Sequence, residues 1–232
     1  MAIHQKKHNF PIVKLGEVAE TINGLWKGTK GPLKTVGIIR VTNFTKNCEF
    51  TLEKTAFIEV EEKKYLKRKL QPGDLIVERS GGGPKQPVGR CVYFDVQEGE
   101  YSVSNFTSIL RVKDPEKVDA KYLQKYLTAL YFQGETERIQ SNTTGLRNLD
   151  FDAYLDFEIP LPPLDEQREV VEGLERRMGK VEELEKRFEG MRVAAERAFK
   201  AQLNEAFNQL DAKKLGWEKS RRKFMRESLR RR

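Results

Sequence analysis

Hydrophobic and polar positions follow two different patterns along the chain. Up to residue 158, short apolar runs alternate with clusters of Gly, Pro, Asp and Asn, a pattern typical of short strands separated by turns. After Pro163 the apolar residues recur every three or four positions as far as Leu210, and no proline interrupts them. That period is typical of a helix. The pattern therefore predicts a globular domain over 1–158, followed by a proline junction and a long helix over 159–212.

The globular part combines strand and helix signals. Strand signals rich in β-branched and aromatic residues occur at Val36–Val41, Thr55–Val60, Asp74–Glu78, Gly89–Phe94 and Ser108–Val112. Helical spacing occurs from about Lys14 (KLGEVAETI), over Lys63–Leu70 and over Val118–Phe132. No regular strand–helix alternation with a Gly-rich first turn appears, so we predict an α+β fold, a mixed domain with several short strands.

The predicted helix from Leu164 to Leu210 is too long to pack against its own domain along its whole length. About 47 residues at ~1.5 Å each span roughly 70 Å, more than the width of a domain of this size. Asp165 and Glu166 suit the positive N-terminal end of a helix. The residues expected to make a dimerisation stripe are Val171, Leu174, Met178, Val181, Leu184, Phe188, Met191 and Ala195.

A second long helix is the most economical partner for this stripe, because the chain has only one such segment. A solvent-exposed helix and a bundle within the chain are the alternatives. The spacing departs from a strict heptad near Val181 and Leu184, and again near Ala198 and Leu203. We therefore expect a homodimer held by an antiparallel coiled coil or helix pair rather than by a regular parallel coiled coil.

The net charge of +8 is concentrated at the C-terminal end. Residues 213–232 carry 10 Lys and Arg against 2 Asp and Glu, whereas residues 1–163 carry 24 against 21. Net charge is thus weak evidence for specific recognition of a polyanion. The basic tail could be a disordered solubilising end, a nonspecific DNA-binding extension, or a helical extension that grips a partner.

The sequence gives little sign of a metal site, a catalytic site or a targeting segment. Cys48 and Cys91 have no CxxC spacing, and His4 and His8 are the only histidines, so no metal site and no His-based catalysis are expected. The Gly81–Gly83 loop does not match a nucleotide-binding motif. The apolar runs are too short for a signal peptide or a membrane span. We expect a cytoplasmic, non-catalytic chain without a cofactor of its own.

The junction IPLPPLDEQ at Ile159–Gln167, leading into a long amphipathic helix, resembles that of the DNA specificity subunits of type I restriction-modification systems. Further short motifs agree in order, and they are KLGEV from Lys14, IRVTN from Ile39, PGDLIV from Pro72 and SNTTGLRN from Ser141. The resemblance covers about residues 12–200. Such subunits usually hold two recognition domains and two spacer helices, whereas this chain has one of each.

The resemblance implies a half-subunit that dimerises to read a palindromic split site in double-stranded DNA. It also implies two further partners, a modification (methyltransferase) subunit that would carry S-adenosylmethionine and a restriction (translocase/endonuclease) subunit. A stand-alone DNA-binding regulator and a coiled-coil adaptor without DNA binding are the alternatives.

Specific DNA reading needs Arg, Lys, Asn, Gln, Ser or Thr side chains that can enter a groove. Three loops and one strand end supply such residues. The loop Arg79–Gln86 with Arg90 is favoured as a DNA contact, whereas the other segments could equally be structural or solvated. The candidates are Lys27, Lys30, Lys34, Arg40, Asn43, Arg79, Ser80, Lys85, Gln86, Arg90, Arg138, Asn142, Thr143, Thr144 and Arg147.

Overall fold

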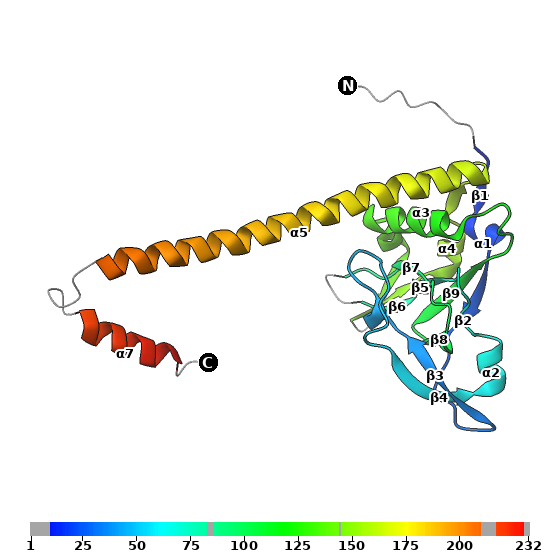
Figure 1. Cartoon of the computed structure of the whole chain (residues 1–232). Coiled ribbons are helices and arrows are strands. Elements are labelled where there is room, and N and C mark those ends of the chain that lie inside the picture. The colour runs from blue at the N-terminus through cyan, green and yellow to red at the C-terminus, as the bar shows by residue number, and fades with distance from the viewer. Residues whose placement is uncertain (1–9, 83–85, 144, 210–216, 230–232) are drawn as a thin grey trace. The chain divides into compact units, whose positions relative to one another are not determined.

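The computed structural model describes residues 10–82, 86–143, 145–209 and 217–229 and divides into two compact units, 1–173 and 174–232 (Figure 1). The first unit is a mixed α+β domain that also contains the first turns of a long helix. The second consists of the rest of that helix and a shorter one. The α+β class predicted from the sequence is confirmed.

A four-stranded antiparallel sheet forms the centre of the first unit. Its order is β2 (Ala19–Asn23), β9 (Thr107–Val112), β5 (Leu75–Glu78) and β7 (Cys91–Tyr93). All four residues of β5 are buried, because the sheet is covered on both faces. Leu75 and Val77 belong to one core cluster, whereas Ile76 belongs to another, as expected from the alternation of side chains along a strand.

Helix α3 (Ala120–Phe132) covers one face of this sheet, with Leu123 and Leu127 fully buried in the first cluster. The other face packs against a second sheet of order β4 (Ala56–Glu61), β3 (Leu33–Ile39) and β8 (Tyr101–Val103). Figure 1 shows α3 and the β3–β4 pair on opposite sides of the central sheet. The domain is therefore built in three layers, a helix, a sheet and a sheet.

The remaining elements of the first unit are short. They are β1 (Ile12–Lys14), α1 (Leu15–Val18), a 3-10 turn at Val41–Asn43, α2 (Glu62–Leu66), β6 (Ser80–Gly81), a 3-10 turn at Glu135–Ile139, β10 (Gln140–Thr143), β11 (Leu146–Leu149), α4 (Phe151–Leu155) and β12 (Glu158–Pro160). Two small sheets join them: β1 pairs with β12, and β6 pairs with β11, which pairs with β10.

The proline junction belongs to the folded domain. Strand β12 pairs with β1, so that Val13 lies opposite the fully buried Ile159. Helix α5 (Leu164–Gln209) then begins on the domain surface, and its Val171 packs into the first core cluster. The boundary that we predicted after residue 158 consequently falls within the first compact unit, which extends to Gly173.

Helix α5 is continuous from Leu164 to Gln209, and in the second unit α7 (Trp217–Leu229) follows it. Apolar side chains of α5 are largely exposed, from 37% at Met178 to 66% at Phe188 and Met191. The described part of the basic tail is thus helical, and its Phe224 and Met225 are exposed. Exposed apolar side chains therefore lie along both helices of the second unit.

Every strand that the sequence predicts in the domain is present, with ends shifted by a few residues. Two helix predictions are wrong in part. The helix expected over KLGEVAETI ends at Val18, and Ala19–Asn23 forms β2 instead, paired along its whole length with β9. The helix expected over Lys63–Leu70 is confined to Glu62–Leu66.

Candidate nucleic-acid interface

Several polar residues meet at one end of the four-stranded sheet. Strand β2 ends at Asn23, opposite Ser108 at the start of β9. Strand β5 ends at Glu78, opposite Thr107. Because these strands are antiparallel, the segments that follow or precede them emerge at the same end of the sheet. The sheet thereby places the segments around residues 23, 79 and 106 next to one another.

Arg79 is held in a fixed position at this end. Its Nη1 donates to Asn23 Oδ1 at 2.8 Å and lies 3.4 Å from Ser108 Oγ, and its guanidinium lies 4.3 Å from the ring centroid of Phe151. Both bonds use the same nitrogen, and a guanidinium carries five N–H donors. Arg79 can therefore keep this position and still donate to a ligand.

The small sheet β6–β11–β10 joins two of the loops that we predicted as DNA contacts. Ser80 pairs with Asn148, and Ser80 Oγ donates to Asn148 Oδ1 at 2.6 Å. Arg147 pairs with Gly81, and its Nη1 lies 3.5 Å from Gln140 Oε1. The loops around residues 80 and 147, separated by more than sixty positions in the sequence, thus form one surface.

Phe106 adds an aromatic side chain that sequence reasoning missed. Its carbonyl oxygen accepts from the backbone N–H of Arg79 at 2.9 Å and of Ser80 at 3.2 Å, and its side chain is 46% exposed. An apolar residue between Asn105 and Thr107, at a turn before a strand, was the available signal. We call the set Asn23, Arg79, Ser80, Phe106, Arg147 and Asn148 the strand-end surface.

Two candidate contacts, Asn43 and Arg90, are not retained because they are buried. The amide of Asn43 accepts from Arg40 N at 3.0 Å and donates to Thr51 O at 2.9 Å, so it closes a turn inside the domain. Arg90 is 4% exposed and makes two hydrogen bonds, of 2.8 and 3.2 Å, to the fully buried Glu78. Burial alone would lower the pKa of Arg90, but Glu78 raises it above its usual value.

Four candidates lie on or near the other sheet. Lys34 pairs with Glu100 and lies over the ring of Tyr65, whereas Arg40 at the far end of β3 donates to Lys54 O at 3.0 Å. Lys27 and Lys30 are exposed in the loop before β3. Lys34 and Arg40 are thus partly engaged within the domain.

The remaining candidates lie in different environments or outside the described residues. Arg138 forms a surface ion pair of 2.7 Å with Glu135. The amide oxygen of Gln86, oriented to suit its partners, accepts from Arg90 at 2.9 and 3.1 Å. Asn142 and Thr143 lie on β10, opposite Arg147 and Leu146. Lys85 and Thr144 lie outside the described residues.

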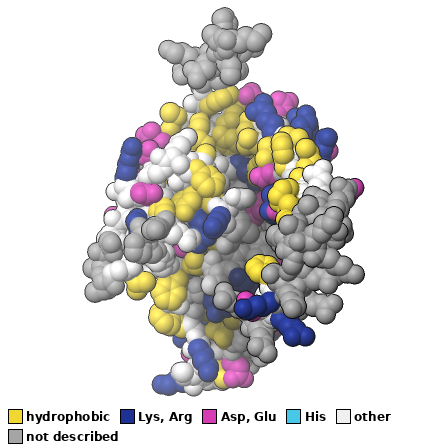
Figure 2. Space-filling view, turned by 90° about the vertical axis from the view of Figure 1, so that its left-hand side faces the viewer, with side chains coloured by type: hydrophobic (Ala, Val, Ile, Leu, Met, Phe, Trp, Pro, Cys, Tyr) yellow, Lys and Arg dark blue, Asp and Glu magenta, His cyan; other side chains and the backbone are white. Residues whose placement is uncertain are grey.

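Figure 2 shows how charged side chains are distributed on one face of the molecule. On the face shown in Figure 2, the Lys and Arg side chains that the structure describes are interspersed with uncharged and hydrophobic ones. A DNA interface on this face would consequently depend on individually positioned side chains more than on a continuous basic patch.

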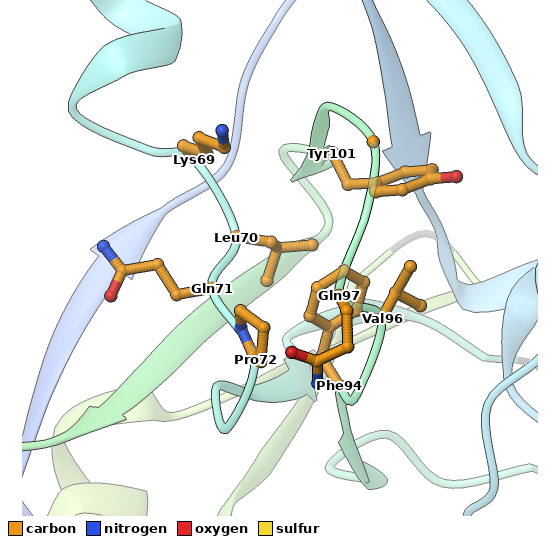
Figure 3. Close-up of a pocket in the computed structure, with 9 residues that line it drawn as sticks. Lys69, Leu70, Gln71, Pro72, Phe94, Val96, Gln97 and Tyr101 are labelled. Atoms are coloured by element: carbon orange, nitrogen blue, oxygen red, sulfur yellow. The ribbon is translucent and has the colours of Figure 1, made fainter.

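A hollow of about 310 Å³ lies at the opposite end of the central sheet, before β5 begins and after β7 ends. Figure 3 shows Leu70 and Pro72 facing Phe94 and Val96, with Gln71 directed away. Its other lining residues are Lys69, Gln97, Gly99 and Tyr101. The hollow is therefore separate from the strand-end surface.

The described residues contain no group of three or more His, Cys, Asp or Glu side chains able to hold a metal ion. The two histidines lie outside them. Cys48 and Cys91 are buried free thiols, and burial raises the pKa of Cys48 to about 11 and that of Cys91 well above its usual value. Over the same part of the chain, no helix combines the length and apolarity needed to cross a membrane.

The described residues thus form a layered α+β domain with a polar surface at one sheet end, from which the chain continues into a long helix. The chain belongs to the family of the type I restriction modification DNA specificity domain, whose model matches residues 7–187.

Solved structures share this fold. One chain, from work on complex assembly and conformational transition of the type I R-M system, aligns with a TM-score of 0.52 and 21% identity over 78% of this chain. The HsdS subunit from Thermoanaerobacter tengcongensis aligns with a TM-score of 0.50 and 20% identity over 79%. In each case the alignment covers 42% of the other chain, so this chain spans less than half their length. No match was found among curated proteins.

Proposed function

We propose that this chain recognises a DNA sequence through its strand-end surface and directs the other subunits of a type I restriction-modification system to that sequence. The observation that carries the proposal is the convergence of Asn23, Arg79, Ser80 and Asn148 at one sheet end. It joins three separate segments of a chain whose family is that of DNA specificity domains.

The chemistry of this surface suits base reading. Arg binds guanine edges through two parallel hydrogen bonds, and Asn binds adenine in the same way. The bonds within the surface fix side chains before DNA arrives, which reduces the entropy lost on binding. We expect Arg79 and Arg147 to donate to bases or phosphates and the exposed Lys27 and Lys30 to contribute phosphate contacts.

The exposed stripe of α5 supports pairing with a second copy. Leu174, Met178, Val181, Leu184, Phe188, Met191 and Ala195 remain as the predicted dimerisation residues. Val171 is removed from that set, because it is 5% exposed and packs into the core of its own domain. A homodimer with two-fold symmetry would present identical domains to identical half-sites, so its target would be a palindrome interrupted by a spacer.

The reaction itself would belong to partner subunits. A modification subunit with bound S-adenosylmethionine would transfer methyl groups, and a restriction subunit would cleave DNA. This chain would determine which DNA sequence is recognised and how far apart the two half-sites lie.

Co-expression with a candidate adenine methyltransferase subunit, followed by sequencing of methylated positions, tests the proposal. We expect one bipartite palindromic motif. Failure of the two chains to assemble, or methylation without a defined motif, would contradict it. Specific DNA binding by the chain alone, with no effect on methylation, would favour a stand-alone regulator instead.

A further inference from the structure

We infer that Phe106 reads thymine by placing its ring against the C5-methyl group in the major groove. The inference rests on the proposed function and assigns one residue of the strand-end surface a role in specificity.

The turn that carries Phe106 is tightly constrained. Thr107 N and Thr107 Oγ1 donate to Ser104 O at 3.0 and 2.9 Å, and Ser104 N donates to Ile39 O at 2.9 Å. Ser104 and Thr107 are 6% and 1% exposed. Gly24 packs so closely on this turn that a Cβ atom there would lie 1.8 Å from Ser104 O. The backbone of Phe106 is thus fixed from three sides.

The side chain of Phe106 is far more exposed than those of Ser104 and Thr107. It is 46% exposed and belongs to none of the three core clusters formed by described residues. Its carbonyl oxygen accepts from the backbone N–H groups of Arg79 and Ser80, so the turn that carries the ring lies against the segment that carries two polar residues of the surface. A rigid turn that presents an apolar ring among hydrogen-bonding groups is suited to a ligand with both kinds of feature.

The major groove offers that combination. Each base pair presents donors and acceptors there, and thymine also presents a methyl group, which apolar side chains contact. Insertion of the ring between bases would instead require unstacking, which costs a few kcal/mol per step. A methyl contact needs no such distortion and fits a partly exposed ring on a fixed backbone.

The test is a double-mutant cycle between protein and DNA. Once methylation mapping has given the motif, the assembled complex is measured for binding to duplexes in which each thymine of the half-site is replaced in turn by uracil, which lacks the methyl group. We expect one position at which uracil weakens binding by the wild-type complex about 4-fold, the effect of one methyl-sized apolar group. At that position Phe106→Ala should bind thymine and uracil equally.

Phe57→Ala is the matched control, because Phe57 is 66% exposed on β4 of the other sheet. It should keep the full thymine preference. Phe106→Leu retains an apolar side chain and should keep part of it, which separates loss of contact from loss of folding.

Independent effects of Phe106→Ala and uracil at every position would overturn the inference and leave the proposed function intact. So would a half-site without thymine, or 2-aminopurine fluorescence that reports unstacking dependent on Phe106. Absence of any methylation motif would overturn both proposals.

Discussion

The side chain of Gln167 joins the start of α5 to the start of α3, since its Oε1 accepts from the backbone N–H of Asp119 at 2.9 Å. Its Nε2 donates to Lys117 O at 2.8 Å and to Pro162 O at 2.7 Å. Gln167 is fully buried. The last residue of the IPLPPLDEQ motif therefore fastens the first turn of the long helix to the domain.

Substitution of Gln167 should destabilise the domain. Gln167→Leu keeps the volume but leaves one backbone donor and two acceptors without their partner, and each unsatisfied buried group costs about 1–3 kcal/mol. We expect a loss of at least about 2 kcal/mol in the free energy of unfolding, measured by urea denaturation. Glu169→Ala, at an exposed position of the same helix, is the control and should change it by less than about 0.5 kcal/mol. Equal effects of the two would contradict the anchoring role.

Two glycines of α5 offer a stabilising substitution. At about 100° per residue, Gly179 and Gly190 fall on the side of the helix opposite the apolar stripe, and a Cβ atom at either position meets nothing within 4 Å. Ala is favoured over Gly inside a helix by about 0.8–1.0 kcal/mol. Gly179→Ala and Gly190→Ala should each raise the melting temperature of the helical signal in circular dichroism, without changing the mass of the assembly. A reduced mass would place the glycines in an interface.

The stripe itself is tested by Phe188→Glu. If Phe188 is buried in a helix pair, its loss costs about 3–5 kcal/mol, which corresponds to at least about 100-fold weaker dimerisation. Sedimentation velocity at micromolar concentration should then show a monomer. Lys186→Glu adds negative charge on the opposite side of the helix and should leave the dimer intact. A wild-type monomer under these conditions would contradict self-sufficient pairing.

The buried thiols predict a sensitivity to alkaline pH. The pKa of Cys48 is raised by burial to about 11 from its ordinary 9.0. The unfolded chain therefore loses this proton at lower pH than the folded chain, and stability should fall as the pH rises from about 9 to 11. Cys48→Ala should reduce this fall in urea denaturation measured across the range. At pH 8, a thiol reagent should label the wild-type chain only as fast as it unfolds, and rapid labelling of the folded chain would contradict burial.

The sequence was a good guide where the cause of structure is local. The period of the long helix and the apolar strands depend on neighbouring residues, and the structure confirms both. Ala19–Asn23 has no strong strand signal and forms one because β9, far along the chain, provides its partner. Pairing of distant segments overrides local preference in this way.

The candidate site shows the same division. Residue types suitable for DNA were found near residues 79 and 147, but their meeting depends on pairing between β6 and β11. Residue type alone does not tell whether a polar side chain is buried or exposed. Arg90, buried against Glu78, and Asn43, buried within its turn, were therefore wrongly included. Phe106 was missed because an aromatic residue in a sequence predicts a core position, whereas here the backbone turns it outward.

Methylation mapping with Arg79→Ala tests most directly whether the strand-end surface reads sequence. Arg79 touches Asn23 and Phe151 at this end of the sheet, and loss of a base contact costs about 1–3 kcal/mol and relaxes the preference at one position. Lys117→Ala, which removes a surface ion pair with Asp114, is the control. We predict that Arg79→Ala accepts additional bases at one position of each half-site, while Lys117→Ala methylates the wild-type motif. An unchanged motif in a folded Arg79→Ala complex would contradict the account.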